Sequence, residues 1–263
     1  MVAANRSAFL EAALAASNAA ADVIREGYAG QFSVTTKEDR TPVTDVDVAA
    51  EKVIHQQLAE VFPDHAFYGE ETGRHNTSSE YLWLVDPIDG TKAFVRGYPF
   101  FSTQIALMKK GELILGVSQA PLFGETAWAE KGRGAFLNDA PLSVSDVGVL
   151  EDAAISTGNT HSLAAGPGWQ ILGDIVARCS RIRGYGDFLH YHLLAGGQID
   201  GVIESDLNIL DIAALTVIVR EAGGVMTDLV GQPIDLATTS VLAGNPTIYR
   251  KLALAFDVPV TDP

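Results

Sequence analysis

The chain has 263 residues, of which 47% are hydrophobic and 19% are charged, and its net charge at pH 7 is −15. This length and composition suit one large domain or two small ones and exclude a disordered chain. The negative charge argues against nucleic acid and anionic membrane as partners, and a phosphorylated substrate would need local cations at its site.

The first predicted element is an amphipathic helix over residues 7–29, rich in alanine. Polar residues such as Glu11 and Asn18 interrupt this helix, so it has no apolar span of membrane length. It also lacks the basic start that is typical of a signal peptide. The single cysteine, Cys179, excludes an intrachain disulfide and fits a reducing compartment. We therefore expect a cytoplasmic protein without a membrane segment.

A short strand at 32–36 and a charged loop at 37–42 precede a second predicted helix over residues 44–61. Thr44 or Asp45 would suit its N-cap. Asp45 and Asp47 would complement the positive end of the helix dipole, so capping explains each of them about as well as a chemical role does.

A strand candidate at 67–71 ends in two adjacent glutamates, Glu70 and Glu71. Two like charges side by side repel each other, so a purely structural interpretation makes this a solvated turn. The functional interpretation makes Glu70 a metal ligand that also polarises a water molecule.

The most informative stretch is Trp83–Thr91, where an apolar strand runs into an acidic turn. Pro87 has a fixed φ and no N–H to donate, so we expect the strand to stop there. Asp86 and Asp89 can point at one spot around the turn, and a hard cation such as Mg²⁺ would relieve their repulsion.

The end of this stretch supplies backbone donors. Gly90 lets the chain bend or approach a ligand closely, and the N–H groups of Gly90 and Thr91 would open toward the same spot and favour phosphate. An Asx-type turn could also use these residues. A metal on one side and N–H donors on the other together describe a phosphate-ester site.

After this stretch, a series of strands gives way to alternating strands and helices. Strands are predicted at 104–108, 113–120, 125–130, 135–137 and 142–144, and a boundary at 146–152 separates an N-terminal α+β half, 1–150, from a C-terminal α/β half, 151–263. In the second half, strands at 153–157, 180–182, 201–204, 225–228 and 240–243 alternate with helices at 167–177, 188–195, 210–222 and 247–255. Asp211, in the first turn of the helix at 210–222, is either its N-cap or an acidic ligand.

Several motifs together resemble those of the inositol monophosphatase superfamily: Pro42-Val43-Thr44 with Asp47, Gly69-Glu70-Glu71, Asp86-Pro87-Ile88-Asp89-Gly90-Thr91, and Asp211 with Ala213-Ala214 and Glu221-Ala222-Gly223-Gly224. The chain departs from the family at Leu210, where tryptophan is usual. The resemblance implies an α+β, layered α-β-α-β-α sandwich of the inositol monophosphatase and fructose-bisphosphatase type. It also implies a Mg²⁺-dependent, Li⁺-sensitive phosphomonoesterase that is commonly a homodimer and acts on a small molecule.

The resemblance and the acidic pattern together assign roles. The expected ligands for two or three Mg²⁺ ions are Glu70, Asp86, Asp89, Asp211 and the Ile88 carbonyl. Glu70 and Thr91 are expected to orient the attacking water and Asp47 to act near it. Gly90 and Thr91 are expected to hold the phosphate.

Two segments indicate the substrate, the run from Arg181 to Tyr191 and the run Asp89–Pro99. Both resemble the histidinol-phosphate phosphatase branch of the superfamily. A carboxylate pair, Asp187 and Glu204, would suit the ammonium and imidazole of histidinol phosphate; the expected substrate contacts are Asp89, Asp187, Glu204 and Arg183. Asp187 could instead cap a helix, Glu204 could be a solvated strand end, and Arg183 could be structural. The alternatives are an inositol-1-phosphate or broad sugar-phosphate phosphatase, or a non-catalytic regulatory relative.

Overall fold

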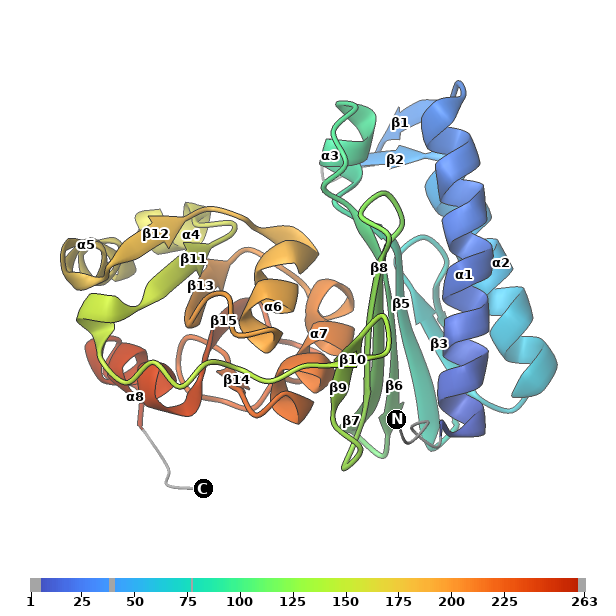
Figure 1. The fold of residues 1–263 in the computed structure, drawn as a ribbon. Helices are drawn as coiled ribbons and strands as arrows, with labels where there is room; N and C mark the ends of the chain where they lie inside the picture. The colour runs from blue at the N-terminus through green and yellow to red at the C-terminus, as the bar shows by residue number, and fades with distance from the viewer. Residues whose placement is uncertain (1–5, 38–40, 77, 260–263) are drawn as a thin grey trace.

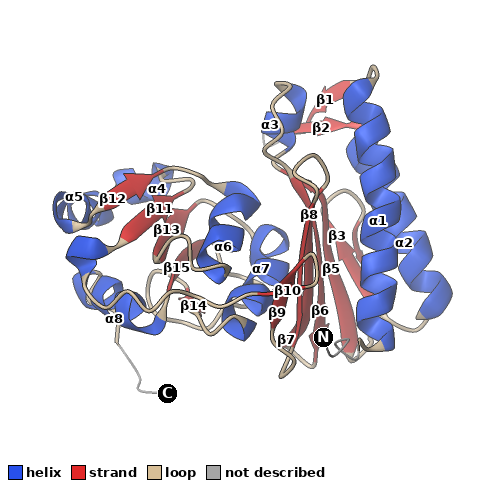
Figure 2. Ribbon diagram, in the orientation of Figure 1, coloured by secondary structure: helices blue, strands red, loops and turns tan. Residues whose placement is uncertain are grey.

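The computed structural model describes residues 6–37, 41–76 and 78–259 and stacks helices and sheets in alternating layers (Figures 1 and 2). The order is an outer helix pair, an eight-stranded sheet, an inner helix pair, a five-stranded sheet and a final helix layer, which confirms the expected α-β-α-β-α sandwich. The helices are α1 (Ala8–Ala29) and α2 (Asp45–Val61), then α6 (Asp187–Ala195) and α7 (Ile209–Glu221), then α4 (His161–Ala164), α5 (Gly168–Arg178) and α8 (Pro246–Ala255).

The larger sheet has the strand order β10-β9-β8-β7-β6-β5-β3-β4, and its neighbours are antiparallel except for β3 and β5. Its strands are β3 (Ala66–Gly69), β4 (Gly73–His75), β5 (Tyr81–Asp89), β6 (Ser102–Lys109), β7 (Glu112–Ala120), β8 (Glu125–Glu130), β9 (Ala135–Leu137) and β10 (Ala140–Pro141). A separate hairpin pairs β1 (Val34–Thr36) with β2 (Pro42–Thr44), and the predicted loop between them includes residues 38–40, which lie outside the described residues.

The strand predicted at 142–144 is wrong. The short strand lies two residues earlier, at Ala140–Pro141, and pairs with β9. The chain then leaves the sheet edge, because the N–H of Val144 donates to the carbonyl of Ala222 at the end of α7 (3.0 Å). Val144, the one β-branched residue of this segment, therefore lies in a crossing between layers and not in a sheet.

The smaller sheet has the order β12-β11-β13-β15-β14. Its strands are β11 (Ala154–Thr157), β12 (Arg181–Arg183), β13 (Gly201–Ser205), β14 (Val225–Thr227) and β15 (Ser240–Gly244), and a 3₁₀ turn, Leu150–Asp152, precedes them. β11 is parallel to both of its neighbours, whereas β15 is antiparallel to both of its own. The alternation of strands and helices therefore yields a mixed sheet.

The inner helices bind the two sheets together. One core cluster joins α6 and α7 to side chains of both sheets, such as Leu84 in β5 and Val241 in β15. Gly116 in β7 permits the closest approach, since an added Cβ would lie 2.2 Å from the carbonyl oxygen of Ala214 in α7. This contact holds α7 against the larger sheet; the division into two domains at residue 150 remains a prediction. Within the described ranges, no helix has both the length and the apolar character needed to cross a membrane.

Candidate active site

Strand β5 does not end at Pro87, and that expectation is wrong. The strand continues to Asp89 because its pairing with β6 shifts register between Asp86 and Asp89, a bulge that tolerates a residue without an N–H. The Pro87 carbonyl accepts a hydrogen bond from Thr103 Oγ1 (2.9 Å). The bulge thus keeps both aspartates on a strand of the sheet.

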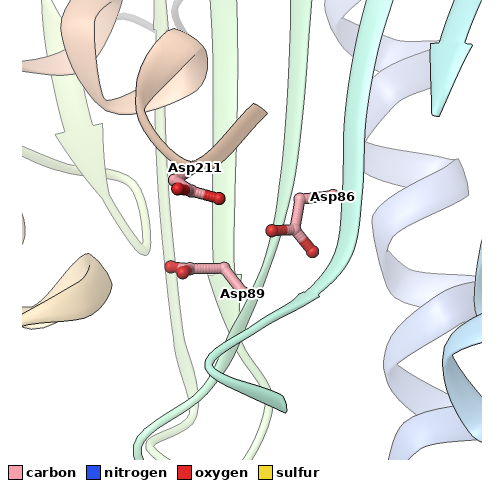
Figure 3. A group of neighbouring side chains, drawn as sticks. All are labelled: Asp86, Asp89 and Asp211. Atoms are coloured by element: carbon pink, nitrogen blue, oxygen red, sulfur yellow. The ribbon is translucent and has the colours of Figure 1, made fainter. Parts of the chain in front are cut away.

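Three aspartates converge at this point. Asp86, Asp89 and Asp211 each offer a carboxylate oxygen, and these oxygens lie within 4.8 Å of one another (Figure 3). Asp86 and Asp89 are buried, at 3% and 7% exposure. Burial and then the neighbouring carboxylates raise the pKa of both well above the ordinary value, and burial raises the pKa of Asp211 to about 7.

A cation fits this cluster. Asp86 Oδ1 is buried and has no hydrogen-bond partner among the described residues. A buried, unpaired carboxylate oxygen beside two further carboxylates is costly unless a positive charge is present. Oxygen ligands of this kind suit hard divalent ions.

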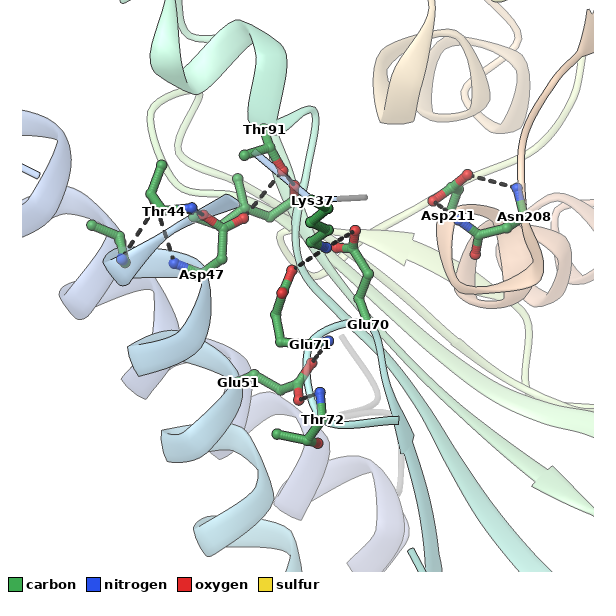
Figure 4. Close-up of polar contacts among 12 residues, drawn as sticks. Lys37, Thr44, Asp47, Glu51, Glu70, Glu71, Thr72, Thr91, Asn208 and Asp211 are labelled. Carbon is green, nitrogen blue, oxygen red and sulfur yellow. Dashed lines mark hydrogen bonds and ion pairs between the residues drawn. The ribbon is translucent and has the colours of Figure 1, made fainter. Parts of the chain in front are cut away.

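The start of α7 positions Asp211. Asn208 is the N-cap, and its side-chain oxygen accepts from the N–H of Leu210 (2.7 Å). Asp211 Oδ2 in turn accepts from the Asn208 N–H (2.8 Å), and Asp211 Oδ1 accepts from Asn208 Nδ2 (3.0 Å; Figure 4). The interpretation of Asp211 as the N-cap is therefore wrong, because Asn208 holds that position and orients the aspartate.

Glu70 lies at the edge of the site and faces a lysine. Lys37 Nζ is 2.9 Å from Glu70 Oε1 and 2.7 Å from Glu71 Oε1 (Figure 4). The side chain of Glu71 is 8% exposed, so these glutamates form an ion-paired turn and not a solvated one. Glu51 supports the turn by accepting from the N–H groups of Glu71 (2.8 Å) and Thr72 (2.9 Å).

Asp47 serves a helix and a hydroxyl at once. Thr44 is the N-cap of α2, and Asp47 Oδ2 accepts from the Thr44 N–H (2.8 Å) and from the Thr44 hydroxyl. Asp47 Oδ1 lies 3.1 Å from Thr91 Oγ1, which is also 2.9 Å from the Ile88 carbonyl oxygen. Burial raises the pKa of Asp47. The capping role and the contact with Thr91 are thus both present, and Asp45 takes no part in them.

Gly90 makes the turn that follows β5 possible. Its φ is +96°, and an added Cβ would lie 2.5 Å from the Phe100 carbonyl oxygen, so no other residue fits without displacement. The short helix α3 (Thr91–Val95) begins directly after it.

A cavity of about 370 Å³ collects these groups. Eight residues assigned from the sequence line it: Glu70, Asp86, Ile88, Asp89, Gly90, Thr91, Asp187 and Asp211. Other lining residues were not assigned, among them Lys92, Tyr98, Asn159, Asp206 and Asn208. Lys92 supplies the one basic side chain among the described residues that line the cavity, and it directly follows the stretch Trp83–Thr91.

Asp187 borders a small recess beside this cavity, together with Asp89, Tyr191 and Glu204. It is the first residue of α6, its φ is +44°, and the N-cap is Gly186, so the helix-cap interpretation of Asp187 is wrong. Among the described residues, none donates a hydrogen bond to its carboxylate. Burial, followed by the charge of Glu204, raises the pKa of Asp187 to about 6.

Glu204 is buried and held by three donors, so it is not a solvated strand end. Its Oε1 accepts from the Asn159 N–H (3.1 Å), and its Oε2 lies 3.1 Å from His190 Nε2 and 2.8 Å from the Tyr191 hydroxyl. Burial acts to raise the pKa of Glu204, but His190 and these hydrogen bonds outweigh burial and leave the pKa below its ordinary value. The neighbouring His192 has other partners, Ser118 and Glu125.

Arg183 lies away from the site. It is exposed, its guanidinium donates to the neighbouring Ile182 carbonyl (2.7 Å), and it lines neither the cavity nor the recess. The structure therefore does not bring Arg183 to the other residues assigned to the substrate.

Comparison with known proteins places the chain among phosphatases. Residues 5–257 match the model of the Inositol monophosphatase family. A histidinol-phosphatase from Mycobacterium tuberculosis is 40% identical over 227 residues, covering 83% of this chain and 86% of the relative. An inositol-1-monophosphatase from Mesorhizobium japonicum is 35% identical over 240 residues, covering 89% and 90%. The crystal structure of the extragenic suppressor protein SuhB from Bartonella henselae superposes with a TM-score of 0.89 at 34% identity, covering 97% of this chain and all of that one.

Proposed function

The chain belongs to the inositol monophosphatase family and is a phosphoric monoester hydrolase, and we propose that its substrate is histidinol phosphate. The observation that carries this proposal is the recess beside the aspartate cluster, which is bordered by the carboxylates of Asp187 and Glu204. A substrate that carries an ammonium and an imidazole has a use for two acids, whereas inositol phosphate offers only hydroxyls. The histidinol-phosphatase relative supports the same substrate.

Within this proposal the two acids act differently. Asp187 is half-buried and accepts no hydrogen bond from the described part of the chain, so it makes the direct contact with the cationic group. Glu204 is already hydrogen-bonded to His190 and Tyr191. It therefore adds a fixed negative charge to the same recess without contacting the substrate first. Asp89 borders both the recess and the cavity, so it lies where the alcohol and phosphate parts of the substrate would meet.

We propose that the carboxylates bind two or three Mg²⁺ ions, held by Asp86, Asp89, Asp211, Glu70 and the Ile88 carbonyl. The unpaired buried oxygen of Asp86 supports this assignment. Bound Mg²⁺ would supply positive charge for the phosphate oxygens and make a water molecule more acidic. To bind a Mg²⁺ ion, Glu70 must give up its ion pair with Lys37.

The remaining residues position the reactants. Thr91 Oγ1 carries one proton, which it can donate to Asp47 Oδ1 while its lone pairs accept a hydrogen bond from the attacking water. The N–H groups of Gly90 and Thr91 would bind the phosphate, and Lys92 would add a positive charge at the same end of the cavity. In-line attack by water then needs no covalent enzyme intermediate.

The second candidate is an inositol-1-phosphate or broad sugar-phosphate phosphatase, which the Mesorhizobium japonicum relative favours. A non-catalytic relative is disfavoured, because the full acidic set meets at one cavity. From the family resemblance we further propose a cytoplasmic homodimer that acts on a small molecule in histidine biosynthesis.

The experiment is phosphate release from histidinol phosphate and from inositol-1-phosphate, measured side by side with Mg²⁺ on the wild type. We expect a higher kcat/KM for histidinol phosphate. Asp89→Asn, which removes a charge from the cluster, should abolish turnover of both substrates while circular dichroism reports an intact fold. A preference for inositol-1-phosphate would support the second candidate, and full turnover by Asp89→Asn would contradict the role of the cluster.

A further inference from the structure

A second and larger cavity, about 690 Å³, lies on the other side of one wall of the active site. Helices α4 and α5 form one side of it, and the segment after β13, the start of β15 and Phe256 close the others. None of the roles assigned above uses this cavity.

The lining of the second cavity combines apolar side chains with hydroxyls. Six apolar residues provide the contact surface: Leu163, Pro167, Ile171, Leu207, Leu229 and Phe256. Four hydroxyls, those of Ser162, Ser205, Thr239 and Ser240, lie among them. This composition is typical of sites that bind a small organic molecule with an apolar body and a few polar groups.

Among the residues that line the second cavity, all of which are described, one side chain is charged at neutral pH: Asp206. Its Oδ2 accepts from the Ser162 N–H (2.8 Å) and from Ser205 Oγ (2.6 Å), and its Oδ1 accepts from the Ser162 hydroxyl. Against the effect of burial, these hydrogen bonds lower the pKa of Asp206 to about 2. A carboxylate has about four lone-pair sites, so at least one acceptor position is left for a ligand.

The backbone at Asp206 is also unusual. Its φ is +59°, a left-handed conformation that a residue with a side chain adopts at some cost. Asn159 Nδ2 donates to the Asp206 carbonyl (3.4 Å), and the Ser205 N–H donates to the Asn159 carbonyl (2.8 Å). These bonds, together with those from Ser162, hold the carboxylate against the cavity wall.

We propose that the second cavity binds a small amphipathic cation, with an apolar body against the six apolar side chains and an ammonium group at Asp206. Charge complementarity selects the cation, because the lining holds the exposed Asp206 carboxylate and no basic side chain. His161 of α4 acts on this carboxylate from outside the lining, so the probe is tested at pH 8, where an ordinary imidazole is neutral. The site is distinct from the active site and shares two residues with it, Asp206 and Leu207. This proposal does not depend on the identity of the phosphate ester.

The test uses 2-phenylethylammonium chloride as the probe and 2-phenylethanol as its neutral counterpart. Both are titrated into the full-length protein by calorimetry at equal ionic strength, with saturating Mg²⁺ and inorganic phosphate present to occupy the active site. We expect the amine to bind roughly threefold more tightly than the alcohol, as an exposed ion pair would predict. Equal binding of the two probes would overturn the role of Asp206.

Two matched variants locate the site on α5. Ile171→Trp fills the cavity and should weaken amine binding at least tenfold, whereas Val176→Trp, an exposed position on the same helix outside the lining, should leave binding unchanged. Asp206→Asn should bind both probes equally. Unchanged binding by a folded Ile171→Trp, or loss of wild-type binding when Mg²⁺ and phosphate are added, would overturn the proposal, since either result puts the amine elsewhere.

Discussion

Replacing Asp211 by Asn should stabilise the protein when divalent cations are absent. The pKa of Asp211 is about 7 in the folded chain, against an ordinary value of 3.8. Between these values the unfolded chain has already lost the proton that the folded chain keeps, so stability falls as pH rises, by about 1.36 kcal/mol per pH unit. At pH 7 the ionisable carboxyl therefore costs at most about 4 kcal/mol, which the amide removes. The amide has one oxygen and gives up one of the two hydrogen bonds from Asn208, about 0.5–1.5 kcal/mol, so a net gain remains.

The assay is urea unfolding of both proteins at pH 4 and pH 7, with EDTA and with excess Mg²⁺. With EDTA, the free energy of unfolding of the variant should rise relative to that of the wild type as the pH increases. Added Mg²⁺ should stabilise the wild type more than the variant, because a cation that binds the folded state raises its stability. Asp206→Asn is a control of opposite sign, since the pKa of Asp206 is lowered to about 2. A variant less stable than the wild type at pH 7 in EDTA, or an equal effect of Mg²⁺ on both, would refute the reasoning.

Three further changes test the packing and the two ends of the site. Gly116→Ala places a Cβ 2.2 Å from a carbonyl oxygen of α7 and should lower the free energy of unfolding in urea by about 1–3 kcal/mol. The control Gly173→Ala, whose Cβ would have no atom within 4 Å, should not destabilise the protein. Equal effects of the two substitutions would contradict the close approach of β7 and α7. Tyr191→Phe removes one donor to Glu204 and should raise the KM for histidinol phosphate about fivefold, which an unchanged KM would contradict. Lys92→Met should raise the KM of both esters about threefold to tenfold, and no effect would exclude a phosphate contact.

Local motifs predicted much of the site because its residues are close in sequence. Asp86 and Asp89 are three residues apart, and a turn between them suffices to direct both at one point. The strand end predicted at Pro87 was wrong, because the rule that proline ends a strand does not foresee a bulge. Asn208 could have been found, since an asparagine three residues before an aspartate is the spacing of a capping box.

Contacts between distant segments could not be predicted in the same way. The sequence assigns His190 no role in the site, because its contact with Glu204 requires α6 to lie beside β13. The ion pair between Lys37 and Glu70 likewise joins two loops far apart in the chain. The helices and strands predicted in the second half lie within one or two residues of their observed bounds, because hydrophobic periodicity and glycines mark them locally. The single-turn helix α4 (His161–Ala164) was not predicted, because four residues are too few to show a helical period.

The central claim, that a carboxylate beside the phosphate site recognises a cationic substrate, is tested most directly by Asp187→Asn. The measurement is kcat/KM for histidinol phosphate and for inositol-1-phosphate on the wild type and the variant. A hydrogen bond to a charged group contributes about 1.5–3 kcal/mol, so we predict a loss of about tenfold to a hundredfold for histidinol phosphate alone. An equal loss for both esters, or no loss for either, would contradict the claim.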